Sequence, residues 1–142
     1  MGVWSAGLAN LGVPLPDLFS LPGAEARILL ALRLAVSSHK QQVDARAELS
    51  CRLGSDQAMN RFLIVIETIG NAWPESFHVG RSCCPCTTPD EILLLQMIRL
   101  SAGGNRPAFD SLLCEMIGEN ERERIFGDLN CFIATYQSGP VD

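Results

Sequence analysis

The stretch 77–91 reads Phe77-His78-Val79-Gly80-Arg81-Ser82-Cys83-Cys84-Pro85-Cys86-Thr87-Thr88-Pro89-Asp90-Glu91. It holds three of the six cysteines and one of the two histidines. It also ends in the clearest helix-start signal of the chain. Thr88 suits the N-cap, Pro89 the first helical position and Glu91 the third, which together form a capping box. We therefore expect a proline-stiffened loop that leads into a helix beginning at Pro89.

Amphipathic segments lie on both sides of this loop. Apolar residues at helical spacing predict three helices before it and three from it onward, over residues 24–38, 40–53, 56–69, 89–102, 107–117 and 121–137. The links are short, and there is no credible strand pair or internal repeat. The pattern predicts an all-α fold, a compact single-domain bundle of five to six helices with the cysteine-containing loop before the fourth.

Residues outside the helical segments define the domain limits. Residues 1–23 are expected to form an irregular N-terminal arm, residues 24–138 the helical domain and residues 139–142 a C-terminal tail. The arm carries apolar side chains that are available to lie against the body, namely Trp4, Leu8, Leu11, Leu18 and Phe19.

Capping and flanking residues fix the expected details of the helices. Ser55 is predicted to cap the third helix, and Gly54 and Gly70-Asn71 to end the second and third. Asn120 with Glu123 suggests another capping box. In the first helix, Arg27 and Arg33 are interpreted as flanks that reach water.

The overall charge limits the classes of partner. A net charge of −5, with the basic residues scattered, argues against nucleic acid or an anionic membrane surface. No basic start precedes an unbroken apolar segment, and no apolar run is long enough to span a bilayer. We therefore expect a cytoplasmic protein whose cysteines are reduced, so their spacing is first examined for metal or redox chemistry.

Three local features resemble a small bacterial family, a domain of unknown function. They are Asp44-Ala45-Arg46-Ala47, the Leu53-Gly54 turn leading through Arg61-Phe62-Leu63, and Cys83-Cys84-Pro85 running into Thr88-Pro89-Asp90-Glu91. The resemblance covers most of residues 24–136. Cys86 stands where a basic residue is expected in relatives. The resemblance implies a helical fold and supplies no activity.

The cysteine loop is the candidate site for metal. Cys83 and Cys86 have the Cys-x-x-Cys spacing of half a zinc site. The candidate ligands for zinc or iron are Cys83, Cys86, Cys84 and His78, with Cys114, Cys131 or His39 as other sources of a fourth ligand. No second matched pair is present, and adjacent Cys83 and Cys84 point in different directions.

Two other interpretations of the same loop remain. Cys86 precedes a helix N-terminus, which favours a thiolate and hence redox chemistry, but Asp90 and Glu91 in the first turn oppose this. Alternatively the cysteines are small, buried side chains in a loop pinned over the core.

No complete catalytic constellation accompanies the loop. A phosphate loop, a Gly-x-Ser-x-Gly elbow and a His-Glu-x-x-His pair are all missing from the sequence. With an apolar fraction of 47%, we expect a non-enzymatic protein that acts through protein contacts, as a homo-oligomer or with an unidentified partner. The alternative is a metal-binding or thiol-redox sensing module that uses the loop Cys83-Cys84-Pro85-Cys86.

Overall fold

The computed structural model describes residues 15–82 and 84–137, and these residues form an all-α fold. Its elements are a short 3-10 helix η1 (Leu18–Ser20) and the α-helices α2 (Gly23–Gln41), α3 (Arg46–Leu53), α4 (Asp56–Ala72), α5 (Pro89–Ala102), α6 (Arg106–Leu113) and α7 (Glu119–Gln137). Within the described ranges, the only β-type pairing is an isolated bridge between Asp17 and Cys86. The predicted fold class is confirmed.

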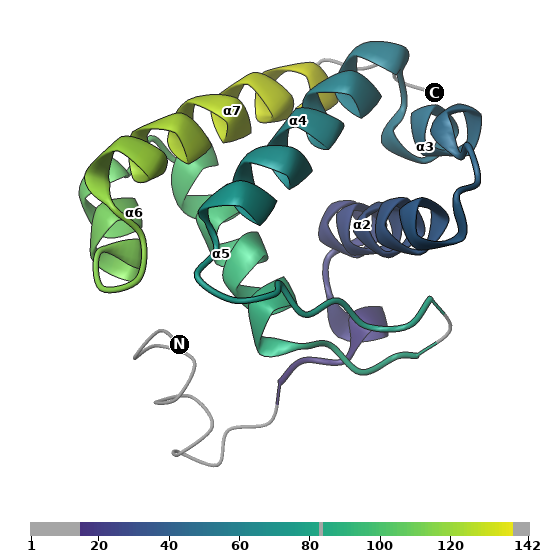
Figure 1. Ribbon diagram of the computed structural model, residues 1–142, viewed down its shortest axis with the longest axis horizontal. Coiled ribbons are helices and arrows are strands. Elements are labelled where there is room, and N and C mark those ends of the chain that lie inside the picture. The colour runs from purple at the N-terminus through teal and green to yellow at the C-terminus, as the bar shows by residue number, and fades with distance from the viewer. Residues whose placement is uncertain (1–14, 83, 138–142) are drawn as a thin grey trace.

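Helices α4 and α7 run side by side and form the most extensive packed pair (Figure 1). Helix α3 links α2 to α4, while α5 and α6 pack against each other and against α7. Phe62 of α4 and Phe132 of α7 place their ring centroids 5.1 Å apart in the core. Both rings are buried, and burial of such apolar surface is the main driving force for the fold.

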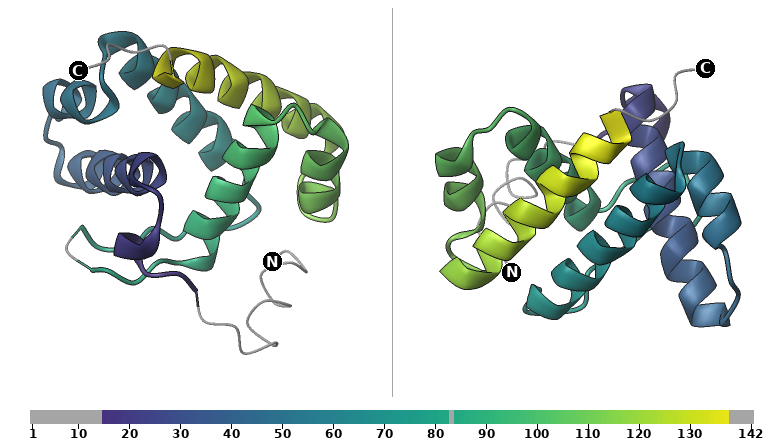
Figure 2. Two further views of the ribbon diagram at one scale, coloured as in Figure 1. Left: turned by 180° about the vertical axis from the view of Figure 1, so that it is seen from behind. Right: turned by 90° about the horizontal axis from the view of Figure 1, so that it is seen from above.

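The segment between α4 and α5 forms a long loop rather than a direct turn. It leaves α4, runs beneath α2 and returns to the start of α5, with η1 beside it (Figures 1 and 2). The helix ends that bound it follow from the sequence. Trp73 precedes Pro74 and takes an extended conformation that ends α4, and the Thr88–Glu91 capping box begins α5 with Pro89 as its first residue.

Three predicted helix boundaries are wrong. Helix α2 continues to Gln41 and stops where Gln42 adopts a left-handed conformation with φ 58°, so the predicted helix 40–53 is only Arg46–Leu53. Val43 lies in the link between α2 and α3 and is 57% exposed. Gly70-Asn71 does not end α4, since a helical glycine weakens a helix without breaking it and the chain continues to Ala72.

The last two helices also differ from expectation. Helix α6 ends at Leu113, and the chain then turns to Ile117 instead of remaining helical to Gly118. Helix α7 begins at Glu119, so Asn120 lies inside the helix and the predicted Asn120–Glu123 capping box is wrong. Glu123 instead forms an ion pair with Arg106 at 2.6 Å.

The described part of the N-terminal arm is only partly as predicted. Leu18 is buried against the body, whereas Phe19 points away and is 79% exposed. Trp4, Leu8 and Leu11 lie outside the described residues, as does the tail 139–142. Among the helices that the structure describes, none is both long and apolar enough to cross a membrane.

Candidate functional site

A buried ion pair lies beneath the cysteine loop. The Arg33 Nε donates to Glu91 Oε2 at 2.8 Å and its Nη2 donates to Glu91 Oε1 at 2.9 Å. Both side chains are fully buried. The prediction that Arg33 reaches water is therefore wrong. Its guanidinium enters the interior because Glu91 and the carbonyl groups of the loop supply acceptors for its N–H groups.

The Arg33 guanidinium also holds the backbone of the loop. It donates to the carbonyl oxygens of Arg81 at 3.0 Å, Cys84 at 2.6 Å and Cys86 at 2.8 Å. A Cβ placed on Gly80 would lie 2.6 Å from Arg33 Nη2, so this close approach requires glycine. We call Arg33, Glu91 and the loop groups that they bind the Arg33 clamp.

Glu91 completes the Arg33 clamp from the side of α5. Its carboxylate accepts from the Gly80 N–H at 3.0 Å and from the Thr88 N–H at 2.9 Å. Burial acts to raise the pKa of Glu91, but the hydrogen bonds from Arg33 and from these two N–H groups outweigh it and lower the pKa. The hydrogen bond to Glu91 in turn raises the pKa of Arg33. The pair is therefore charged, and one carboxylate serves as both helix cap and loop anchor.

The cysteines of the loop are less buried than an inert core position requires. Cys84 is half-buried and Cys86 is exposed. The pKa of the Cys86 thiol is raised, and interaction with the neighbouring Cys84 thiol is the largest cause. A raised pKa disfavours the thiolate that redox chemistry needs. Cys83 lies outside the described residues.

The other candidate ligands are not gathered around these two cysteines. His78 is exposed, and its backbone is fixed by N–H donation to Asp90 Oδ2 at 2.8 Å and by acceptance from Thr88 Oγ1 at 2.7 Å. Cys114 and Cys131 are exposed, as is His39 in the last turn of α2. In the residues that the structure describes, no three His, Cys, Asp or Glu side chains are grouped to hold a metal ion.

An exposed surface lies where the N-terminal segment meets the cysteine loop. The Leu18 N–H donates to the Pro85 carbonyl at 2.7 Å, and Thr87 Oγ1 donates to the Pro16 carbonyl at 2.6 Å. These bonds, with the Asp17–Cys86 bridge, join two otherwise irregular segments. Their exposed residues include the polar Asp17 and Ser20, and we call the less polar ones, Pro16, Phe19, Pro85 and Cys86, the Phe19 edge.

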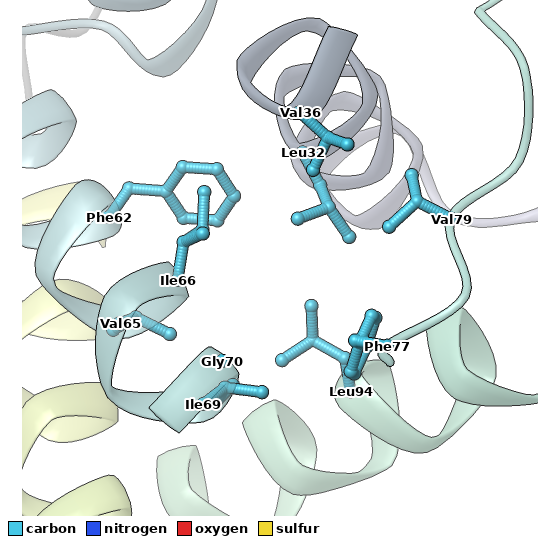
Figure 3. Close-up of a pocket in the computed structure, with 10 residues that line it drawn as sticks. All are labelled: Leu32, Val36, Phe62, Val65, Ile66, Ile69, Gly70, Phe77, Val79 and Leu94. Atoms are coloured by element: carbon cyan, nitrogen blue, oxygen red, sulfur yellow. The ribbon is translucent and has the colours of Figure 1, made fainter. Parts of the chain in front are cut away.

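A cavity of ≈ 180 Å³ lies between α2, α4, α5 and the segment 77–79 (Figure 3). The side chains that line it are all apolar, and the lining residues are Leu32, Val36, Phe62, Val65, Ile66, Ile69, Gly70, Phe77, Val79 and Leu94. The sequence predicted no such cavity. Its only signals were the apolar residues around nearly all of α4 and the isolated apolar pair Phe77 and Val79 in a polar loop.

Comparison of the chain with protein-family models, with curated proteins and with solved structures found no match. The resemblance to a bacterial domain of unknown function therefore stays a prediction from the three local features that suggest it. A function is inferred below from the contacts and exposure of the chain's own residues.

Proposed function

We propose that the protein is a non-enzymatic helical protein that acts through protein–protein contacts, in the first place with a second copy of itself. The observation that carries the proposal is the exposure of Phe19, which at 79% is the most exposed large apolar side chain among the described residues. Large aromatic side chains are frequent anchors of protein interfaces.

The fixed backbone around Phe19 supports this role. Asp17 Oδ1 accepts from the Phe19 N–H at 3.1 Å and caps η1, while Leu18 is buried and bonded to Pro85. Pro85 in turn lies between Cys84 and Cys86, whose carbonyls Arg33 holds. An exposed aromatic residue on a backbone fixed in this way loses little conformational entropy when a partner binds.

The bonding of the titratable groups favours a function in protein–protein contacts and not in catalysis. Glu91 is engaged by Arg33 and two backbone N–H groups, and Asp110 is engaged by Arg106 and Arg122. A general acid or base must exchange protons with a substrate, whereas these carboxylates already hold neighbouring parts of the chain.

Sedimentation equilibrium across a concentration series tests the proposal. We expect the native chain to form a dimer reversibly and Phe19→Ser to weaken the association by at least about tenfold, which is about 1.4 kcal/mol. The matched control is Val43→Ser, because Val43 is also exposed but lies far along the chain in the α2–α3 link. A native chain that stays monomeric at high concentration, or equal weakening by both variants, would contradict the dimer.

The second candidate function is a metal-binding or thiol-sensing module that uses Cys83, Cys84, Cys86 and His78. The observation that favours it is that Arg33 donates to the carbonyls of both Cys84 and Cys86, which fixes the backbone that carries these two cysteines. Such preorganisation is a property of metal sites. In the cytoplasm, where we propose that the chain works, these thiols would be reduced and available to zinc or iron.

Metal analysis of protein purified without a chelator separates the two functions. A bound metal site predicts about one equivalent of zinc or iron that Cys86→Ser removes, with thiols shielded from titration until a chelator is added. Cys131→Ser is the control, because Cys131 is exposed on α7 away from the loop. Metal at background level in the native chain would refute the metal site and leave the contact function standing.

A further inference from the structure

The cavity of Figure 3 is partly open, because Gly70 is exposed and Phe77 and Val79 are only partly buried, but it is larger than the gaps that a well-packed interior contains. Protein cores contain few voids bigger than a water molecule. This cavity measures ≈ 180 Å³, and Figure 3 shows side chains from α2, α4, α5 and the segment 77–79 ringing a common open space. Helix α2 supplies Leu32 and Val36 on one side, and α4 supplies Phe62, Val65, Ile66 and Ile69 on the other.

The chemistry of the walls excludes polar occupants. Every lining side chain is apolar, and Gly70 contributes no side chain at all. A water molecule needs two to four polar partners to be held in a cavity, and a buried carboxylate or ammonium without a partner is far more costly. The cavity is therefore suited to an occupant that has neither charge nor strong hydrogen-bonding groups.

We propose that this cavity is a binding site for one small neutral apolar molecule, of about the size of a single substituted aromatic ring. An apolar cavity of about 150 Å³ binds benzene, so ≈ 180 Å³ leaves room for one ring with a methyl-sized substituent. The site is separate from the Phe19 edge, and neither proposal depends on the other.

One wall of the site provides the way in. Phe77 and Val79 belong to the loop, not to a helix, and both are only partly buried. The loop is fixed on either side of Val79, because the His78 N–H donates to Asp90 and the Gly80 N–H donates to Glu91. The two side chains therefore stand at defined positions at the edge of the cavity, and a ligand can enter past them without the unfolding of a helix.

Toluene is the probe for this site, with benzoate as the charged control. In methyl ¹H–¹³C spectra of the full-length chain, toluene should shift the Leu32, Val65 and Ile69 signals saturably. The methyl groups of Leu113 and Leu129 should not move, because both residues are buried in α6 and α7 and do not line the cavity. Benzoate should shift none of these signals, since its carboxylate finds no partner in the walls.

Two substitutions test whether the cavity itself is the site. Gly70→Leu places a side chain at the lining position on α4, where an added Cβ meets nothing within 4 Å. Val79→Phe enlarges the loop wall. One added methylene in an apolar pocket changes binding by about 10–200-fold, so we expect each variant to weaken toluene binding at least about tenfold.

Gly127→Leu is the matched control for Gly70→Leu. Gly127 lies in α7, its added Cβ also meets nothing within 4 Å, and it does not line the cavity. Both substitutions replace a helical glycine by a better helix former, so both variants should fold. Native toluene affinity in Gly127→Leu, with weakened affinity in the two cavity variants, supports the site.

Three results would overturn it. One is the absence of shifts at Leu32, Val65 and Ile69 up to the solubility of toluene, which would mean that the space is closed or already filled by the chain itself. The others are native affinity in both Gly70→Leu and Val79→Phe, and benzoate binding as strong as that of toluene.

Discussion

Two regions of the molecule contain the same kind of ion pair, an arginine with a carboxylate, in different surroundings. In the Arg33 clamp, both charged side chains are 0% exposed. Where α6 meets α7, Arg106 pairs with Asp110 and Glu123, and the Glu123 side chain is 72% exposed. Water stabilises the members of the exposed pairs when they separate, but it does not reach either member of the buried pair.

The two regions also differ in what the charges hold. Arg106 pairs with Asp110 within α6 and with Glu123 on α7, and the backbones of both helices already satisfy their own hydrogen bonds. The Arg33 clamp holds the irregular loop 80–88, whose carbonyl and N–H groups find partners in Arg33 and Glu91. Loss of an exposed pair therefore leaves the local structure in place, whereas loss of the clamp leaves buried groups without partners.

Arg33→Met should cause the largest loss of stability and so test the difference between the two regions most strongly. It removes five N–H donors and leaves the Glu91 charge buried, and breaking such a pair costs about 3–5 kcal/mol of unfolding free energy. Urea unfolding followed by circular dichroism measures the loss. Arg106→Met is the control and should shift the urea midpoint far less. Similar shifts in the two variants would show that burial does not separate the two regions.

The pH dependence of stability should distinguish the two regions next. The pKa of Glu91 is lowered from its ordinary value of 4.5 in the folded chain, so its contribution is complete above about pH 4.5 and is lost as the pH falls through the folded pKa. Urea unfolding should show that the free energy of unfolding falls between about pH 7 and pH 3, and that this fall is shallower in Glu91→Gln.

Asp110, whose side chain is 33% exposed, provides the less buried counterpart in the same measurement. Burial acts to raise its pKa, but hydrogen bonds from Arg106 and Arg122 lower it, so its contribution has the same sign as that of Glu91. About 1 M salt should suppress the pH-dependent stability that Asp110→Asn removes, because salt screens exposed charges most. The same salt should leave the pH-dependent stability that Glu91→Gln removes. Equal suppression of both would be evidence that the clamp is open to water.

Thr88→Ala tests whether the loop depends on the capping box as well as on Arg33. Thr88 Oγ1 accepts from the Glu91 N–H at 3.1 Å and donates to the His78 carbonyl at 2.7 Å. Loss of a cap costs about 1 kcal/mol. We expect about 2 kcal/mol for Thr88→Ala and about 1 kcal/mol for Ser55→Ala, whose hydroxyl caps α4 alone. Equal losses on urea unfolding would show that the bond to His78 contributes nothing.

Arg52→Ala should give the smallest effect. Arg52 and Glu48 form an i, i+4 pair on α3, with 38% and 55% of their side chains exposed. Such pairs contribute about 0.3–0.5 kcal/mol, and the effect should disappear in about 1 M salt. A loss comparable to that of Arg33→Met would remove the distinction between exposed and buried pairs.

The helix starts could be predicted from the sequence because they are local. Ser55 and the Thr88–Glu91 box act within a single turn, and each begins the helix where its pattern indicates. The end of α2 could not be predicted in this way. Gln42 carries a positive φ of 58° without being glycine, so nothing in its residue type marks the turn.

The Arg33 clamp was missed although half of its signal was present. Arg33 lies four positions after Leu29 and three before Val36, so it falls on the apolar stripe of its helix, where a charge requires a buried partner. The partner could not be identified because Glu91 is 58 residues away and already had a local role as a cap. The cavity could not be predicted from the sequence for a similar reason, because it depends on the positions of α2 and the segment 77–79 relative to α4.

The Arg33 clamp also constrains how this sequence can diverge. A chain that first changes Arg33 keeps a buried carboxylate with no counter-charge, and one that first changes Glu91 keeps a buried guanidinium, so each single step passes through a poorly folded intermediate. Gly80 is linked to this pair, since a Cβ at position 80 would lie 2.6 Å from Arg33 Nη2 and would force the guanidinium to shift. Positions 33, 80 and 91 should therefore be inherited as a unit, and a descendant that abandons one of them should have replaced all three.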